Sequence, residues 1–162
     1  MKWIMSLALM TALTVAGQAQ IKAVEAFIED HPNLDEYYVY QSTLRMINQE
    51  GDPDFNRLIK DIRKINIYIS EGSTDVTEES YREMLTDLAN EGFEVLINAK
   101  YEATLINMMS KDAGNRSYYV LAVRDTDNFG LMEMDGSLDL RYLKALEKMD
   151  FGKLQKLVMD QK

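Results

Sequence analysis

The sequence contains no cysteine and a single histidine, His31. Without cysteine the chain has no disulfide, no thiolate metal site and no nucleophilic thiol. One histidine without cysteine partners cannot form a zinc site, and His31 stands between acidic residues and Pro32. We therefore expect His31 to be an exposed residue in the turn that ends a helix.

The motifs of several enzyme classes are missing as well. A Ser/His/Asp triad would have to use His31, and no G-x-S-x-G sequence supplies its serine. Glycine motifs that bind phosphate are also absent, because GNRS and GDPD have the wrong spacing. We expect no cofactor and no resident metal.

Positive charge is scarce, with 18 Lys and Arg against 27 Asp and Glu and a net charge of −9. An acidic surface repels nucleic acid phosphates and anionic lipid head groups, so we expect neither as a partner. The hydrophobic fraction of 46% and the charged fraction of 28% are typical of soluble globular proteins. A chain of 162 residues is long enough for one domain with a core of its own.

The N-terminal residues 1–19 have the pattern of a secretory signal peptide. Lys2 precedes a largely apolar run, and Gly17 and Ala19 are the small residues of a cleavage site. We expect cleavage between Ala19 and Gln20, which would leave the mature chain periplasmic or secreted. The alternative is an uncleaved N-terminal anchor. No later segment is apolar enough to cross a bilayer, so we expect no stable membrane insertion after cleavage.

Apolar residues at helical spacing predict several helices along the chain. Their ends carry the expected signals, with Pro53 at a helix start, Thr77 as an N-cap and Gly92 as a stop. The predicted helices run from Ile21 to before Pro32; for a turn or two from Ser42; from Pro53 with the stripe Phe55, Leu58, Ile59 and Ile62; from Thr77 to Gly92; and from a cap at Ser137 or Asp139 with the stripe Leu140, Leu143, Leu146 and Met149, followed by Phe151, Leu154, Leu157 and Val158.

Alternating and β-branched stretches predict six strands, the last four of them adjacent in the chain. The predicted strands cover residues 35–41, 64–70, 93–99, 102–110, 117–123 and 129–135. Adjacent strands with short connections pair antiparallel. The pattern predicts a single α+β domain over residues 20–162, with helices packed on one face of a mainly antiparallel sheet.

The stretch 123–137 crowds five potential oxygen ligands into a dozen positions: Asp125, Asp127, Asn128, Glu133 and Asp135. A calcium loop counted from Asp125 would need ligands at its fifth and twelfth positions, which are Phe129 and Gly136. This mismatch favours a hairpin turn, in which Asp and Asn bond their own backbone. Asp125 and Asp127 stay weak candidates for an acidic site.

Glu133 and Asp135 are two residues apart on a predicted strand and therefore share a face. Paired carboxylates can act as acid and base in glycoside hydrolysis. A hydrolase using Glu133, Asp135 or Asp125 would require a cleft in which these groups converge and have unequal pKa values. The simpler expectation is a solvent-facing strand edge.

Two tyrosine pairs, Tyr37/Tyr38 and Tyr118/Tyr119, lie on predicted strands. Since adjacent strand residues point to opposite sides, one tyrosine of each pair is available for a contact face unless burial takes it. These four residues are the candidate interaction face.

Two blocks of the chain, residues 82–109 and 131–149, resemble the bacterial family known as domain of unknown function 4252. That family tends to end on a strand, a glycine, an Ile/Leu-Asp-Leu step and a helix. The matching residues in LMEMDGSLDLRYLKALEKM are Gly136, Leu138, Asp139 and Leu140. The likeness runs over about residues 34–150 and rests on pattern rather than on a sharp motif.

The resemblance implies a small exported cell-envelope protein, of a kind seen mostly in Bacteroidetes, with no established catalytic residues. Many relatives carry a lipid-attachment cysteine after the signal, where this chain has Ala19-Gln20. Free periplasmic residence is therefore expected rather than a lipid anchor.

Our leading hypothesis is a non-enzymatic, exported binding domain whose partner is another envelope protein. Two alternatives stay open. One is the hydrolase with carboxylates on an acidic sheet face. The other is a carrier of a small apolar ligand, which would need a cavity of about 300 Å³ or more.

Overall fold

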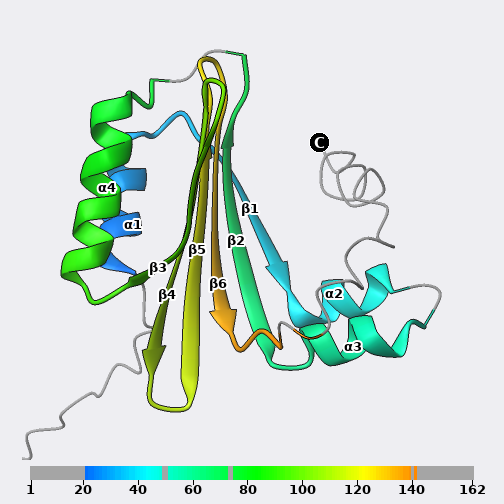
Figure 1. Cartoon of the computed structure of the whole chain (residues 1–162). Coiled ribbons are helices and arrows are strands. Elements are labelled where there is room, and N and C mark those ends of the chain that lie inside the picture. The colour runs from blue at the N-terminus through cyan, green and yellow to red at the C-terminus, as the bar shows by residue number, and fades with distance from the viewer. Residues whose placement is uncertain (1–20, 49–50, 73–74, 140, 142–162) are drawn as a thin grey trace, which may run out of the picture.

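The computed structural model describes residues 21–48, 51–72, 75–139 and 141, and these form one α+β domain (Figure 1). The six strands of its sheet lie in the order β1-β2-β6-β5-β4-β3, and every neighbouring pair is antiparallel. The strands are β1 (Asp35–Tyr40), β2 (Ile62–Ser70), β3 (Glu94–Tyr101), β4 (Thr104–Ala113), β5 (Arg116–Arg124) and β6 (Phe129–Gly136). The helices are α1 (Lys22–Asp30), α2 (Gln41–Ile47), α3 (Pro53–Ile59) and α4 (Glu78–Asn90). The predicted fold class is confirmed.

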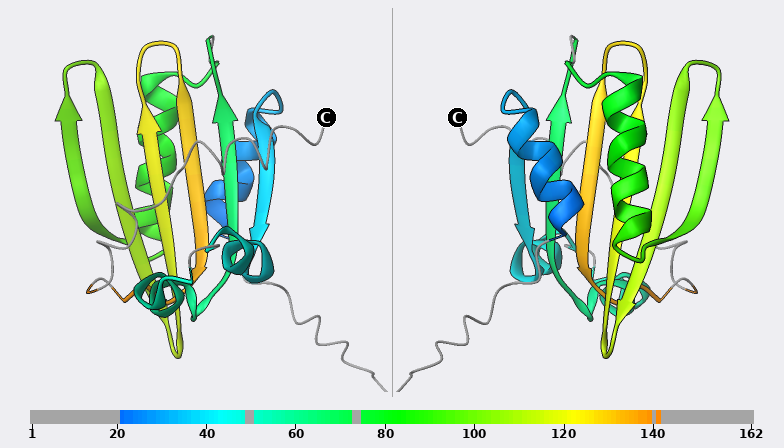
Figure 2. Two further views of the ribbon diagram at one scale, coloured as in Figure 1. Left: turned by 90° about the vertical axis from the view of Figure 1, so that its right-hand side faces the viewer. Right: turned by 90° about the vertical axis from the view of Figure 1, so that its left-hand side faces the viewer.

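The two longer helices, α1 and α4, lie side by side on one face of the sheet, which we call the helix face (Figure 2). Strand alternation points one set of side chains at these helices. Tyr68, Met109, Val120 and Leu131 are among the residues buried there, and Phe27 of α1 packs with them. This face holds the larger hydrophobic core.

The opposite side of the sheet, which we call the open face, is covered by described elements only at one end (Figure 2). There α2 and α3 bury a second cluster that includes Phe55, Leu58 and Ile65. Ile67, Met132 and Met134 are half-buried and pack against this cluster. Further along the open face the half-buried apolar side chains are Tyr37, Ile69, Ile106, Met108, Tyr119, Leu121 and Val123.

Helix α4 forms as its sequence predicts. The Thr77 hydroxyl oxygen accepts a hydrogen bond from the Ser80 amide at 3.0 Å, which satisfies one of the free N–H groups of the first turn. Tyr81 and Leu88 then face the sheet. The chain leaves the helix through Gly92, whose φ of +91° suits glycine.

The second and third helices differ from prediction at their ends. The cap of α2 lies at Tyr40 rather than Ser42. The stripe from Pro53 was predicted to extend to Ile62, but α3 ends at Ile59 and Ile62 begins β2. Pairing of Ile62 with Gly136 of β6 supplies the strand hydrogen bonds that override the local helical pattern.

The prediction that His31 is exposed is wrong, since its side chain is buried. The ring stacks on Phe27 with 4.3 Å between centroids, and Nδ1 lies 2.7 Å from the Phe27 carbonyl oxygen. The end of α1 places the His31 ring over Phe27, a buried residue of the same helix. The proline and the acidic residues beside His31 in the sequence did not indicate this packing.

Two predictions fall outside the described residues. These are the signal peptide over residues 1–19 and the C-terminal helix with its continuation to Val158. Among the residues that the structure does describe, no helix has the length and apolar character needed to span a membrane.

Candidate functional site

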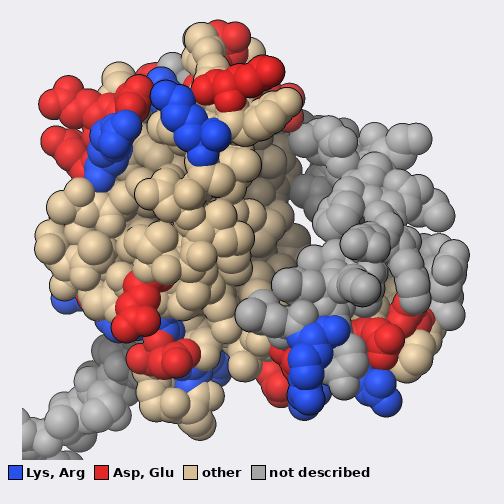
Figure 3. All heavy atoms as spheres, viewed as in Figure 1, with Lys and Arg blue, Asp and Glu red and all other residues tan. Residues whose placement is uncertain are grey.

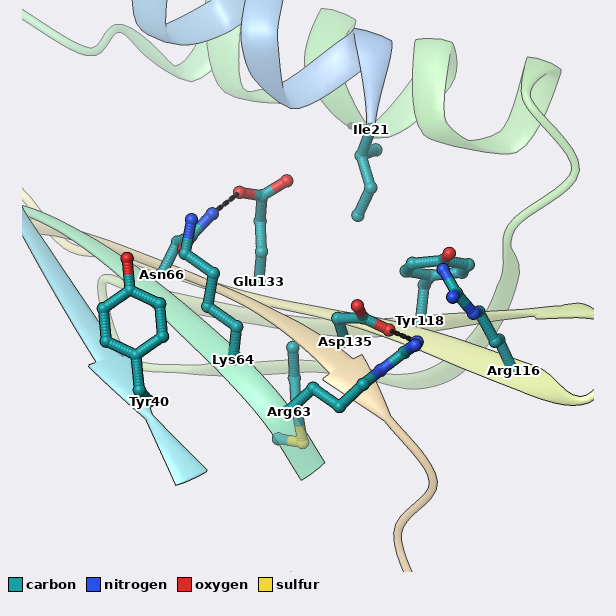
Figure 4. Close-up of a pocket in the computed structure, with 10 residues that line it drawn as sticks. Ile21, Tyr40, Arg63, Lys64, Asn66, Arg116, Tyr118, Glu133 and Asp135 are labelled. Carbon is teal, nitrogen blue, oxygen red and sulfur yellow. Dashed lines mark hydrogen bonds and ion pairs between the residues drawn. The ribbon is translucent and has the colours of Figure 1, made fainter. Parts of the chain in front are cut away.

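A polar pocket of about 370 Å³ opens on the helix face, beside the start of α1 (Figure 4). We call it the Glu133 pocket. Strands β1, β2, β5 and β6 contribute its polar lining, and Ile21 closes one side. The lining residues used below are Tyr40, Arg63, Lys64, Asn66, Arg116, Tyr118, Glu133 and Asp135.

Glu133 lies in the middle of β6 and is only 7% exposed. Its Oε2 accepts hydrogen bonds from Asn66 Nδ2 at 2.9 Å and from the Tyr68 hydroxyl at 3.0 Å. Burial raises the pKa of Glu133, although these two donors and the nearby Lys64 ammonium act in the opposite direction. The carboxyl therefore keeps its proton to a higher pH than an exposed glutamate.

Two polar side chains next to Glu133, those of Tyr68 and Asn66, complete the buried part of the pocket. Burial and the adjacent carboxylate raise the pKa of Tyr68 well above its usual range, so its hydroxyl stays a donor. The Oδ1 atom of Asn66 is buried without a hydrogen-bond partner among the described residues. This atom can accept a hydrogen bond from a group that enters the pocket.

The predicted pair Glu133 and Asp135 does share one face and one pocket. The expectation that both face solvent is wrong for Glu133, because α1 and α4 cover that side of β6. Asp135 is half-buried and forms an ion pair with Arg63 of β2. The two carboxylates thus differ in burial and in partners.

Exposed aromatic residues flank the pocket on β1. Tyr38 and Tyr40 are 49% and 53% exposed, and the Lys64 ammonium lies 4.5 Å from the ring centroid of Tyr38 and 5.9 Å from that of Tyr40. A cation over a ring face adds attraction between the two. The Tyr38 hydroxyl also donates to Glu36 at 2.5 Å, and this bond raises the pKa of Tyr38.

The four tyrosines of the predicted interaction face do not gather on one surface. Tyr38 is exposed on the pocket side and Tyr118 is buried in the pocket wall, whereas Tyr37 and Tyr119 are half-buried on the open face. The rule that adjacent strand residues point to opposite sides is confirmed. The same rule places Tyr40 beside Tyr38, and sequence reasoning overlooked it.

Asp125 and Asp127 lie in the turn between β5 and β6, which confirms the predicted hairpin. Asp125 Oδ1 accepts from the amides of Asp127 and Asn128 at 2.8 Å each, and the Asp125 amide donates to the Asn128 carbonyl oxygen at 3.0 Å. The Asn128 side chain and these amides hold the pKa of Asp125 below its usual range. The turn precedes β6, while Asp135 lies near the strand's other end, so Asp125 does not join the pocket.

Within the described part of the chain, no three histidine or acidic side chains come together as ligands for one metal ion. In the view of Figure 3, charged side chains gather at the top and at the bottom of the molecule, and a broad surface with few charges lies between them. The edge strand β3 adds Val95, Leu96 and Ile97 to the exposed apolar residues.

The fold and pocket define a single-domain α+β protein with a polar pocket under two helices. The family model described as "Domain of unknown function (DUF4252)" matches residues 27–146, and the chain belongs to that family. The resemblance predicted from the C-terminal blocks is thereby confirmed. No curated protein and no solved structure matches the chain.

Proposed function

We propose that this protein is exported to the cell envelope and acts there as a non-enzymatic binding domain. The signal-peptide pattern of residues 1–19 supports export, and the described fold begins at Ile21, so cleavage after Ala19 would remove none of its elements. Intact mass of the protein recovered from the periplasm tests this step. A chain beginning at Gln20 is expected, and a chain that retains Met1 would contradict cleavage.

The observation that carries the binding role is the placement of two exposed tyrosines beside a preformed pocket. Tyr38 and Tyr40 stand next to the pocket lined by Arg63, Lys64 and Arg116. Tyrosine and arginine are the residues most enriched among those that dominate binding energies, and such residues cluster around pockets that receive a partner side chain.

The chemistry of the lining favours a partner side chain that carries a carboxylate. Lys64 and Arg116 bring positive charge to one place on an otherwise acidic protein, which attracts an acidic group. Asn66 Oδ1, deeper in the wall, is an acceptor and can take a hydrogen bond from an N–H group of the same partner segment. An envelope protein with an exposed acidic segment therefore fits this surface.

Crosslinking in intact cells, followed by purification of the tagged protein, tests the binding surface. Tyr40→Ala should reduce recovery of a discrete crosslinked partner by about fivefold or more, because loss of an interface tyrosine commonly costs above ~1 kcal/mol. Tyr101→Ala is the matched control, since Tyr101 is 71% exposed on β3 away from the pocket. Equal recovery with both variants, or no discrete partner with the wild type, would overturn the proposal.

A second candidate, glycoside hydrolysis, is favoured by one specific observation. Glu133 and Asp135 line the same pocket, and burial raises the pKa of Glu133 as a general acid requires. The Cα atoms of residues two apart on a strand are about 6.7 Å apart, so the two carboxyl groups stand on one face as the paired carboxyl groups of a glycosidase do. Turnover of chromogenic glycosides that is lost in Glu133→Gln and kept in Asp127→Asn would support this candidate. No turnover by the wild type would remove it.

The carrier of an apolar ligand receives less support from this pocket. Its volume reaches the required size, but Arg63, Lys64, Arg116, Glu133 and Asp135 give it a strongly charged lining. An apolar ligand there would leave these groups without compensation for lost hydration.

A further inference from the structure

Strand β3 forms one edge of the sheet, and within the described part of the chain only β4 pairs with it (Figure 2). All eight of its residues are exposed. Val95, Ile97 and Tyr101 are 57%, 46% and 71% exposed. Exposed apolar side chains next to the free backbone N–H and C=O groups of a sheet edge mark a place where another strand can add.

We propose that a second copy of this chain adds at this edge, so that two β3 strands pair antiparallel about a two-fold axis at Ala99. The two six-stranded sheets then join edge to edge, with the helix faces of both copies on the same side. Strand β3 lies at the opposite edge of the sheet from β1, which carries Tyr38 and Tyr40. The inference therefore does not depend on the proposed function.

An irregularity in β3 sets the limits of the pairing stretch. The register between β3 and β4 shifts between Val95 and Ile97, so β3 is regular only from Ile97 to the hairpin turn after Tyr101. Ala99 is the centre of this regular stretch. A two-fold axis at Ala99 pairs the whole stretch with its copy, whereas an axis one residue earlier would bring the irregular part of the strand into the ladder.

The side chains are complementary in this register. Ile97 of one copy stands opposite Tyr101 of the other, twice by symmetry, and a β-branched residue opposite an aromatic one is a favourable cross-strand pair. On the other side of the strand Lys100 stands opposite Asn98. An axis one residue later would instead place the two Lys100 side chains opposite each other, where like charges are destabilising.

This self-complementarity favours a second copy over a strand of another protein. Repulsion between two chains of net charge −9 is limited, because exposed charges more than about 8 Å apart are largely screened at physiological salt. A two-fold contact uses β3 of both copies and closes on itself, which predicts a dimer and no larger assembly. The paired stretch is short, so we expect a dissociation constant in the micromolar range, about 1–100 µM.

A charge exchange at Ala99 tests the pairing, because the axis places this exposed residue opposite its own copy. Ala99→Glu and Ala99→Lys each bring two like charges together and should raise the dissociation constant of the dimer by about tenfold or more. An equimolar mixture of the two variants should restore it to within about threefold of the wild-type value, since each mixed dimer pairs opposite charges. Thr86→Glu and Thr86→Lys make the same changes at an exposed position of α4 and should leave the dissociation constant unchanged, alone or mixed.

Sedimentation equilibrium of the purified protein measures the constant. The expected result is a mass twice that of one chain, lost in each Ala99 variant and recovered in their mixture. Recovery in the mixture also separates the effect from misfolding, because one misfolded chain does not restore another. A wild type that is still monomeric at about 0.5 mM would overturn the proposal and leave β3 to a strand of another protein. Loss without recovery in the mixture would overturn it too, as would assembly beyond a dimer.

Discussion

The hydroxyl of Tyr68 on β2 donates a hydrogen bond to the carboxylate of Glu133 on β6 at 3.0 Å, although the two residues are 65 positions apart in the chain. They meet because β6, the last strand, pairs with β2 rather than lying at the edge of the sheet. This pairing places an acidic group below the helices, where its charged form loses hydration. The consequence is a stability that depends on pH.

Replacing Glu133 with glutamine should remove this dependence. The folded-state pKa of Glu133 lies above its ordinary value of 4.5, so the folded protein binds more protons than the unfolded chain between these values. Its contribution to stability is complete at low pH and declines as pH rises through the folded pKa. Glu133→Gln should therefore gain stability relative to wild type as the pH rises from 4.5 toward neutral.

Urea unfolding at a series of pH values measures this difference. Glu94→Gln is the control, because Glu94 is exposed on β3, and its effect should stay within about 0.5 kcal/mol at every pH. A constant difference between Glu133→Gln and wild type across the range would show that burial of this carboxyl has no energetic consequence.

Removal of the Tyr81 hydroxyl should destabilise the contact between α4 and the sheet. This hydroxyl donates toward Asn107 Oδ1 at 2.8 Å and lies 3.1 Å from the Ala122 carbonyl oxygen, and burial raises the pKa of Tyr81 to about 12. Tyr81→Phe leaves both buried acceptors short of a donor, at an expected cost of about 1–3 kcal/mol in the free energy of unfolding. Chemical denaturation measures the loss. Tyr101→Phe, at an exposed position, should change stability by less than about 0.5 kcal/mol, and similar losses in both variants would contradict the argument.

An alanine at position 136 should disrupt the join between β6 and β2. Gly136 has a φ of +149°, and a Cβ atom there would overlap the Asp61 carbonyl oxygen and lie 2.5 Å from the Ile62 Cα. Both obstacles are backbone atoms, so strain and steric overlap should together cost about 2–4 kcal/mol. Gly130→Ala on the same strand meets no atom within 4 Å and should cost less than about 1 kcal/mol. Thermal unfolding of the two variants side by side gives the measurement, and equal melting temperatures would refute the steric explanation.

Loss of the Thr77 cap should weaken α4 without touching its buried side. Thr77→Ala removes the acceptor for the Ser80 amide and should cost about 1 kcal/mol in stability. Thr86→Ala provides the comparison in the same helix, since Thr86 is exposed in the interior, where alanine is the better helix former. We expect it to be neutral or slightly stabilising by circular dichroism melts. A larger loss from Thr86→Ala than from Thr77→Ala would argue against the capping role.

Most secondary structure followed from local patterns, as the agreement over α1, α4 and the six strands shows. These elements depend on residues near one another in the chain: Thr77 caps a helix whose apolar residues recur every three or four positions, and Asp125 bonds amides two and three residues away. The end of α3 was missed because Ile62 fits a helical stripe and a strand equally well, and only its pairing with Gly136 decides between them.

The candidate site could be predicted only in part. Alternation correctly put Glu133 and Asp135 on one face and separated the paired tyrosines, yet it could not say which face the helices cover. For that reason Glu133 was expected in solvent, and Asn66, Lys64 and Arg116 were not associated with it.

The sequence by itself determined most of the described helices, strands and turns, the antiparallel α+β class and the family, because each depends on short-range periodicity or on the residue pattern itself. Only the tertiary structure decided that β6 pairs with β2, that His31 and Glu133 are buried, and which face of the sheet α1 and α4 cover. Those features arise where segments distant in the chain meet, and the free energy of burial there depends on neighbours that no local pattern specifies.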